Sequence, residues 1–223
     1  MTKKQNKKYK ILGRLNKQLG NNELRNYLSN KNETTVSSKN LNPEDNVNYK
    51  NPIKGRAPKV LLIGPPITIP KYMQKRCIPP LGISYVAAAL EKADIDVSIV
   101  DCCVEGWDIE RYNGNLVTYG LPPEQLTERL KKEKYDVIGL SVLFSTDLPN
   151  LYETSKIVKK ALPDCTIVVG GLHPTIYPNE IFELDLSYND DRTVVFVIRG
   201  EGEQRFVDFV NLLKSGMVNK NAD

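Results

Sequence analysis

The sequence has few of the residues from which disulfide frameworks and metal sites are built. Its 223 residues include four cysteines and one histidine, and no two cysteines stand in Cys-x-x-Cys spacing. Four cysteines are too few for a disulfide scaffold at this length, so we expect reduced thiols. A single histidine excludes zinc sites and catalytic triads that need several histidines.

Long apolar runs are also lacking. Runs such as residues 60–63 and 194–198 fall far short of the roughly 20 residues that a membrane-spanning helix needs. The basic start, MTKKQNKKYK, is not followed by the apolar stretch of a secretory signal. The sequence therefore predicts a cytoplasmic protein with no membrane partner.

What the chain does have is a strongly basic first quarter. Residues 1–57 hold 13 Lys and Arg against 4 Asp and Glu, a charge of +9, whereas the whole chain carries +4. The segment is rich in Asn, Lys and Ser and offers few large apolar residues to offset the entropy of ordering, so we predict that it is mostly disordered. Because its basic residues are not interleaved with aromatic residues in a way suited to base stacking, its composition favours a solvated tail or docking segment over nucleic-acid binding.

From residue 59 onward, short apolar runs alternate with helical patterns. The predicted strands are residues 60–64, 96–101, 136–141, 166–170 and 193–199, and the predicted helices are residues 81–92, 122–134, 148–162 and 203–214. This alternation is typical of a parallel sheet covered on both faces. We predict an α/β fold with a doubly wound, five-stranded parallel sheet, flavodoxin-like or Rossmann-like, over residues 58–215, with residues 216–223 as a tail.

Ligands of such folds bind beyond the carboxyl ends of the strands, and the loops at those ends carry unusual residues. Three motifs follow three successive strands: Asp101-Cys102-Cys103-Val104-Glu105-Gly106, Ser141-Val142-Leu143, and Gly170-Gly171-Leu172-His173-Pro174. In order and spacing they resemble the cobalamin (vitamin B12) binding domain, whose signature is Asp-x-His-x-x-Gly, Ser-x-Leu and Gly-Gly. The resemblance covers about residues 58–215.

One position departs from that signature: Cys103 stands where the family has the histidine that ligates cobalt. Two further motifs, Pro79-Pro80-Leu81-Gly82 and Arg199-Gly200-Glu201-Gly202-Glu203, look like the B12 domain that precedes the radical S-adenosylmethionine (SAM) domain of B12-dependent radical enzymes. Members of that group commonly lack the ligating histidine. The resemblance implies cobalamin held without its own base or a histidine on cobalt.

The resemblance also implies which residues bind the cofactor. They are Asp101, Cys103, Gly106, Ser141, Val142, Leu143, Gly170, Gly171 and His173. Glycines at a strand end let a ligand approach the backbone closely, so Gly170 and Gly171 would admit the nucleotide tail, and the Ser141 hydroxyl would meet its polar edge. The neighbouring acids disfavour a Cys103 thiolate, and we expect no protein ligand on cobalt.

The chain contains no Cys-x-x-x-Cys-x-x-Cys motif, which a radical SAM domain needs for its 4Fe-4S cluster. SAM and the cluster are therefore expected only if a separate or missing domain supplies them. The chain is interpreted as the cofactor-holding part, a fragment or subunit, of a B12-dependent radical SAM methyltransferase, without a complete active site of its own.

Two other classes of function stay open. A stand-alone corrinoid carrier would have the same motifs. A nucleotide- or flavin-binding α/β protein would be expected to show Gly-x-Gly-x-x-Gly after the first strand, where this chain has Gly64-Pro65-Pro66, and a non-catalytic interaction module would need no ligand. The sequence does not indicate the substrate or the methyl donor.

Overall fold

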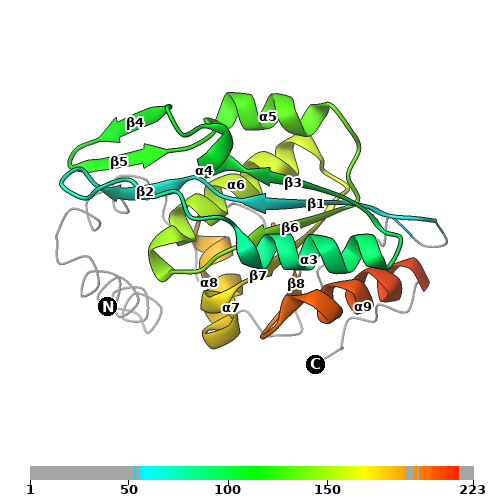
Figure 1. Ribbon diagram of the computed structural model, residues 1–223. Helices are drawn as coiled ribbons and strands as arrows, with labels where there is room; N and C mark the ends of the chain where they lie inside the picture. The colour runs from blue at the N-terminus through cyan, green and yellow to red at the C-terminus, as the bar shows by residue number, and fades with distance from the viewer. Residues whose placement is uncertain (1–52, 54–55, 189–192, 195, 216–223) are drawn as a thin grey trace.

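The computed structural model describes residues 53, 56–188, 193–194 and 196–215 (Figure 1). The prediction of disorder for residues 1–57 and the predicted tail at 216–223 therefore fall almost wholly outside the described residues. Among the helices of the described part, none has the length and apolar character needed to cross a membrane.

The centre of the molecule is a parallel sheet of five strands, as predicted. Their order across the sheet is β3 (Asp96–Asp101), β1 (Lys59–Gly64), β6 (Val137–Ser141), β7 (Thr166–Gly170) and β8 (Phe196–Val197). The chain moves outward in one direction from β1 to β3 and in the other from β6 to β8. The order therefore reverses between β1 and β6, the position at which open α/β sheets bind ligands.

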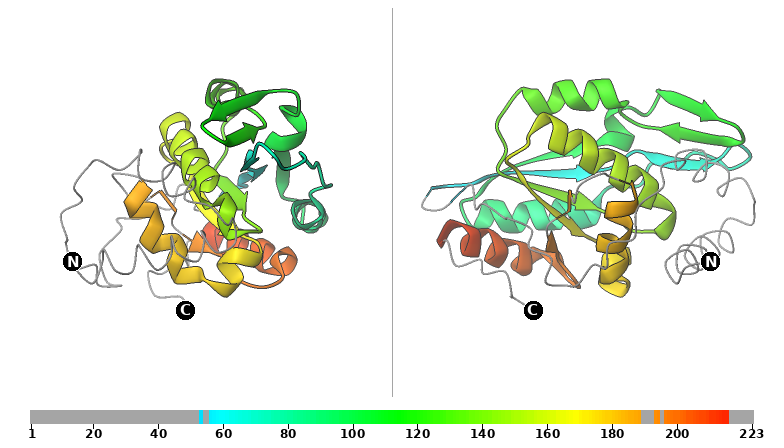
Figure 2. Two further views of the ribbon diagram at one scale, coloured as in Figure 1. Left: turned by 90° about the vertical axis from the view of Figure 1, so that its left-hand side faces the viewer. Right: turned by 180° about the vertical axis from the view of Figure 1, so that it is seen from behind.

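Helices cover both faces of this sheet, which makes the fold doubly wound (Figures 1 and 2). One face packs against α3 (Leu81–Lys92) and α9 (Gly202–Ser215), and the other against α5 (Pro123–Lys131) and α6 (Leu148–Ala161). A further helix, α8 (Pro178–Tyr188), lies against α6.

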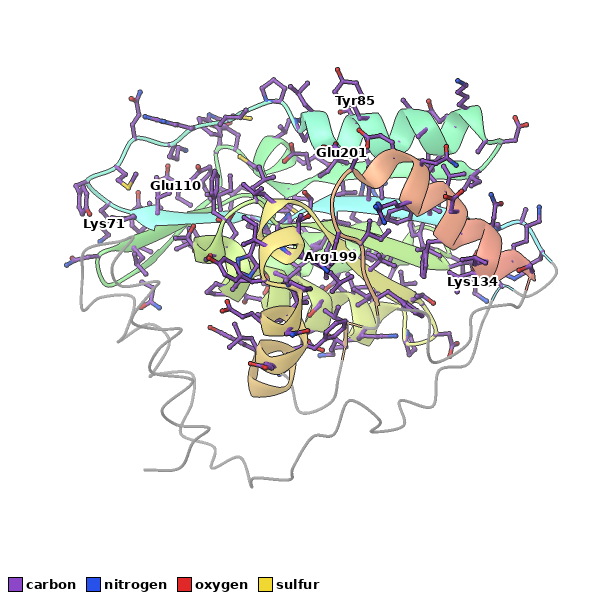
Figure 3. All side chains as sticks on the ribbon, turned by 90° about the horizontal axis from the view of Figure 1, so that it is seen from below. Lys71, Tyr85, Glu110, Lys134, Arg199 and Glu201 are labelled. Carbon is purple, nitrogen blue, oxygen red and sulfur yellow. The ribbon has the colours of Figure 1, made fainter. Side chains whose placement is uncertain are left out.

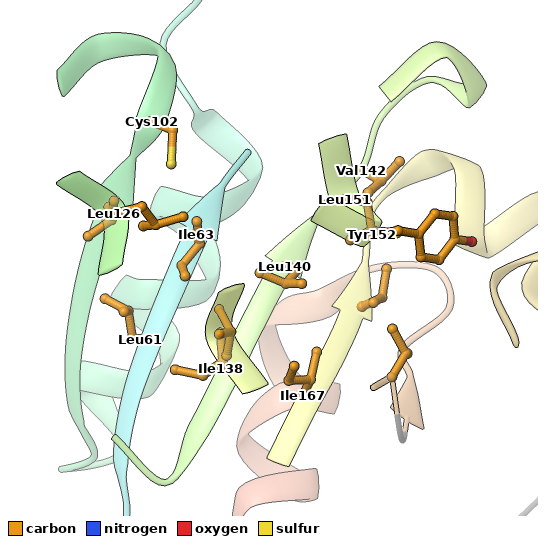
Figure 4. Close-up of a cluster of buried hydrophobic side chains, with 14 of the residues drawn as sticks. Leu61, Ile63, Cys102, Leu126, Ile138, Leu140, Val142, Leu151, Tyr152 and Ile167 are labelled. Carbon is orange, nitrogen blue, oxygen red and sulfur yellow. The ribbon is translucent and has the colours of Figure 1, made fainter. Parts of the chain in front are cut away.

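Alternation along β1 shows how one strand supplies both cores. Leu61 and Ile63 belong to the cluster beneath α5 and α6, whereas Val60 and Leu62 belong to the cluster beneath α3 and α9. Figure 4 shows the first cluster, with side chains from β1, β6 and β7 packed together. Because successive strand residues point to opposite faces, a continuous apolar run is what a sheet buried on both faces requires.

A second, antiparallel sheet extends from the carboxyl end of the main sheet and was not predicted. It consists of β2 (Ile67–Pro70), β5 (Leu116–Tyr119) and β4 (Glu110–Asn113), in that order. The Thr68 hydroxyl lies 2.7 Å from the Thr118 hydroxyl and accepts a 3.0 Å hydrogen bond from the side-chain amide of Asn150, near the start of α6. Asn150 is buried, and its hydrogen bond to Thr68 joins the small sheet to the main domain.

The last strand is shorter than the predicted 193–199, because the backbone amides of residues 193 and 194 form hydrogen bonds outside the sheet. The amides of Thr193 and Val194 donate to one carboxylate oxygen of Asp185 in α8, at 2.7 and 2.9 Å. These donors are thus satisfied by a side chain, and the ladder with β7 pairs Val168 with Phe196 and Val169 with Val197. The predicted boundary at residue 193 is wrong for this reason.

Packing of the folded unit reaches to the amino-terminal side of residue 58. Ile53 is fully buried among the apolar side chains beneath α3 and α9. Arg56 forms an ion pair with Asp136, whose carboxylate also accepts a 2.8 Å hydrogen bond from the Lys59 amide.

Candidate functional site

The neighbouring strands β1, β6 and β7 each end in a small residue: Gly64, Ser141 and Gly170. These three residues lie on the face of the sheet that α3 and α9 cover. Ser141 pairs in register with Gly170, and Gly64 ends the adjacent strand. A Cβ on Gly64 would lie 3.4 Å from Ile83 of α3, so this position faces the α3 side. Large side chains further back in these strands, such as Leu62 and Val168, fill the same face. The absence of large side chains at the strand ends leaves space between the sheet and the two helices.

That space is a cavity of about 300 Å³. Its lining is mainly apolar. The polar residues Ser141, Thr175, Glu201 and Glu203 are half-buried or exposed, and we call this more exposed side of the cavity its mouth. The lining residues are Leu62, Gly82, Ile83, Val86, Gly139, Leu140, Ser141, Leu143, Gly170, Gly171, Leu172, Thr175, Ile198, Gly200, Glu201, Gly202, Glu203 and Phe206. In Figure 3, Glu201 lies where the chain enters α9 beside α3, and Arg199 lies on the segment that leads to it.

The cavity brings together four of the residues predicted to bind a ligand: Ser141, Leu143, Gly170 and Gly171. It adds others that sequence reasoning did not assign to the site, above all Gly82 of α3 and Thr175 of α7 (Leu172–Ile176). The remaining five predicted residues, Asp101, Cys103, Gly106, Val142 and His173, do not line it.

The backbone conformation and the close packing at position 171 both require glycine. Its φ of +113° lies in the region that favours glycine, and a Cβ there would stand 2.3 Å from the Val142 carbonyl oxygen. The amide of Val142 donates to the Gly170 carbonyl at 2.9 Å, and the amide of His173 donates to the Val142 carbonyl at 3.3 Å. Val142 therefore joins the loops after β6 and β7 through its backbone, while its side chain is buried in the core beneath α5 and α6.

The first motif forms a tight turn beside the cavity. One Asp101 carboxylate oxygen accepts hydrogen bonds from the amides of Cys103 and Val104, at 3.0 and 3.2 Å, and so caps the short helix α4 (Cys102–Glu105). A Cβ on Gly106 would stand 2.2 Å from the Leu121 amide nitrogen, so only glycine lets these two backbone segments meet.

Cys103 is buried at the start of this turn. Its thiol lies 3.9 Å from the Arg76 carbonyl oxygen, to which it can donate. Burial, together with the nearby Cys77 and Asp101, raises the pKa of the Cys103 thiol to about 12. Cys103 is therefore a neutral thiol near pH 7.

His173 is 2% exposed and lies behind the cavity wall. Its Nδ1 is 3.0 Å from the Ser145 hydroxyl, and its Nε2 is buried without a hydrogen-bond partner among the described residues. Burial lowers the pKa of His173, so the imidazole is neutral at pH 7. Within the described ranges, no three His, Cys, Asp or Glu side chains are grouped as a metal site would need.

Exposed apolar side chains follow the strand ends. Half or more of each side chain is exposed in five residues on the segments after β3, β6 and β7: Val104, Leu143, Phe144, Leu172 and Ile176. Because the sheet is parallel, these segments lie at the same edge. Exposed apolar residues gathered at one edge make this edge a candidate contact surface.

A doubly wound parallel sheet with a cavity at its switch point defines an open α/β ligand-binding domain. The chain belongs to the B12 binding domain family, whose model matches residues 74–210. The resemblance to cobalamin-binding domains is thereby confirmed.

Several curated proteins are similar to the chain. Cytidylyl-2-hydroxyethylphosphonate methyltransferase from Streptomyces wedmorensis is 32% identical over 155 residues, which cover 68% of this chain and 28% of that protein. Anaerobic magnesium-protoporphyrin IX monomethyl ester cyclase from Rubrivivax gelatinosus is 27% identical, over 62% of this chain and 21% of its own length. Hopanoid C-3 methylase from Methylococcus capsulatus is 26% identical, with coverage of 56% and 20%. The chain thus spans less than a third of the length of these relatives.

Among solved structures, a response regulator from Hahella chejuensis covers 74% of this chain and 99% of its own, with 13% identity and a TM-score of 0.41.

Proposed function

We propose that the chain binds cobalamin with its dimethylbenzimidazole base off the cobalt and without a histidine in its place. The nucleotide tail would enter the cavity between the sheet, α3 and α9, and the corrin ring would lie over the strand ends. The observation that carries this proposal is the in-register pair of Ser141 and Gly170, which lines an apolar cavity over the ends of the strands beside the switch point.

The size and chemistry of the cavity fit the tail. Small-molecule sites enclose roughly 300–1,000 Å³, so a cavity of about 300 Å³ suits a benzimidazole nucleotide and not a whole corrinoid. Apolar lining residues such as Leu62, Ile83 and Phe206 suit the benzimidazole, and the hydroxyl-bearing residues Ser141 and Thr175 in the same lining would meet its polar edge and sugar. The ring, left outside, would cover exposed side chains such as Leu143 and Leu172.

The other predicted residues would act around this cavity. Asp101 and Gly106 shape the α4 turn beneath the ring, and Val142 fixes the position of the Gly-Gly turn. Cys103 and His173 would contribute no ligand to cobalt, because the thiol keeps its proton and the imidazole is buried behind the wall. This supports a cobalt whose lower face meets no protein nitrogen or sulfur.

We place this domain in the cytoplasm as the cofactor-holding part of a methyltransferase-like B12-dependent radical SAM enzyme. When bound, cobalamin supplies a cobalt that can carry a methyl group, and the protein supplies its position. Two relatives named as a methyltransferase and a methylase support this assignment. SAM and an iron–sulfur cluster would belong to a separate or missing domain.

Mixing the full chain with hydroxocobalamin and recording its visible spectrum tests the proposal. We expect a shift to the base-off spectrum, and after reduction an EPR spectrum of cob(II)alamin without nitrogen superhyperfine splitting. An unchanged spectrum would contradict base-off binding, and absence of cobalamin from the protein fraction after gel filtration would contradict cobalamin binding itself. Nitrogen splitting in the spectrum of the bound cofactor would contradict the base-off, histidine-off mode. The assignment of cobalamin as the ligand would then stand without that mode.

A further inference from the structure

Thr175 links two loops that are far apart in the sequence. Its hydroxyl donates to the Gly171 carbonyl at 2.8 Å and accepts from the Gly200 amide at 2.9 Å. Its carbonyl accepts a 3.3 Å hydrogen bond from the Arg199 side chain. One residue therefore connects the turn after β7 to the segment between β8 and α9, which Figure 3 shows at Arg199 and Glu201.

Both glycines that Thr175 joins line the cavity and have left-handed backbone. Gly171 has a φ of +113° and Gly200 a φ of +75°. Glycine is flexible, so a turn that depends on it needs an external contact to keep one conformation. The Thr175 hydroxyl adds such a contact to both turns, and in the first turn it acts beside the backbone hydrogen bonds of Val142.

We infer that Thr175 is a positioning residue that keeps the cavity mouth at the width which the nucleotide tail requires. The inference rests on the proposed function, because it names a residue of the same cavity. A hydroxyl that bonds to the carbonyl four residues earlier is common in helices and has only a local effect. The second bond, from the Gly200 amide across the mouth, is what gives Thr175 a role in the site.

The experiment compares two corrinoids on the full chain. Thr175→Val keeps the shape of the side chain and removes the hydroxyl, and cobinamide lacks the nucleotide tail that cobalamin has. We expect Thr175→Val to weaken cobalamin binding about tenfold, equal to about 1.4 kcal/mol, with cobinamide binding changed less than twofold. Thr175→Ser, which restores the hydroxyl, should bring cobalamin affinity to within about threefold of the wild type.

Gly200→Ala provides a second perturbation of the same link. Nothing approaches a Cβ at Gly200 closer than the Arg205 Nε at 4.0 Å, so alanine there clashes with no protein atom. It strains the left-handed backbone and adds one methyl group to the cavity lining. We expect it to weaken cobalamin binding and spare cobinamide, as Thr175→Val does. Circular dichroism shows whether each variant is folded.

Three outcomes overturn the inference: cobalamin affinity unchanged in folded Thr175→Val, an equal loss for both corrinoids, or failure of Thr175→Ser to rescue. A wild-type chain that binds neither corrinoid contradicts the proposed function instead. The two failures are therefore distinguishable.

Discussion

At the scale of single residues, the cavity is defined by side chains that are small or missing. Its glycines differ in how they tolerate a side chain. A Cβ on Gly171 would collide with the Val142 backbone, whereas a Cβ on Gly82 meets no atom within 4 Å. Substitution of Gly171 would therefore disturb the loop itself, and Gly82 is the better place to test occupation of the cavity.

We predict that Gly82→Leu separates ligand binding from folding. Gly82 lies in the first turn of α3, where leucine is a better helix former, so stability should stay equal or rise by about 0.5–1 kcal/mol. The leucine side chain would occupy space that the tail needs, and cobalamin affinity should fall tenfold or more. Titration followed by absorbance measures the affinity, and thermal unfolding measures the stability.

Ala88→Leu is the matched control for Gly82→Leu. It introduces the same side chain into the same helix at an exposed position that does not line the cavity. Cobalamin affinity should be unchanged. Equal affinity of Gly82→Leu and Ala88→Leu would show that the tail lies elsewhere.

Cys103 gives a pH prediction. Between pH 9 and about 12 the unfolded chain has lost the Cys103 proton and the folded chain has kept it, since burial raises the folded pKa. The unfolded state is then favoured as pH rises, by up to about 1.4 kcal/mol per pH unit for one thiol. Denaturation between pH 8 and 11 should show a steeper loss of stability in the wild type than in Cys103→Ala. Parallel curves would mean that the thiol ionises normally.

The Cys103 thiol should have no effect on the absorption spectrum of the bound cofactor. Bound cobalamin should show no Cys103-dependent transition between pH 6 and 9, and Cys103→Ala should leave its absorbance unchanged. A sulfur-to-cobalt charge-transfer band that disappears in this variant would contradict the prediction.

At the scale of secondary structure, long buried elements were predictable and short ones were not. The runs at β1, β6 and β7 are apolar and buried, and β3 sets Val97, Ile99 and Val100 among polar residues; the predicted bounds of all four agree with the structure to within a residue. The strands of the small sheet are four residues long and mix polar with apolar side chains, as in Glu110–Asn113. Such segments carry no clear period, and their pairing depends on contacts with distant residues.

We predict that Asn150 holds the small sheet in place. Asn150→Ala would remove a buried side chain that is one of the two partners of the Thr68 hydroxyl, which should lower the free energy of unfolding by about 1–3 kcal/mol. Hydrogen exchange at Leu116 and Val117 should speed up as β5 opens. The control Asn113→Ala, at an exposed position, should change stability by less than about 0.5 kcal/mol. Equal exchange rates in both variants would rule out this anchoring role.

At the scale of the whole molecule, the folded unit includes residues on the amino-terminal side of the predicted boundary at 58. We predict that removal of residues 1–57 costs about 2–5 kcal/mol of stability relative to removal of residues 1–50, because it takes away the buried Ile53 and the ion-pair partner of Asp136. Both shortened chains should bind cobalamin within a few-fold of the full chain. Equal denaturation midpoints for the two would show that Ile53 contributes nothing to the core.

The motifs predicted the edge of the sheet at which the cavity lies. They did not show which residues line the cavity and which hold the neighbouring loops in place. Ser141 and Gly170 line the cavity, while Asp101 and Gly106 support a turn beside it. Sequence spacing places residues at a strand end, whereas the direction of each side chain depends on the register of the assembled sheet. Thr175 was missed because its partner Gly200 is 25 residues away along the chain.

The pair of hydrogen bonds at Thr175 has a kinetic consequence. On the proposed function, a cavity mouth that these bonds already hold in place would need no rearrangement before binding, so release of the ligand's own tail would limit the rate. Free cobalamin near neutral pH keeps its base on the cobalt most of the time, and only the fraction with a released tail is competent to enter. The apparent dissociation constant is the intrinsic one divided by that fraction. Mild acidification, which protonates the free base and enlarges the fraction, should therefore speed capture of the cofactor.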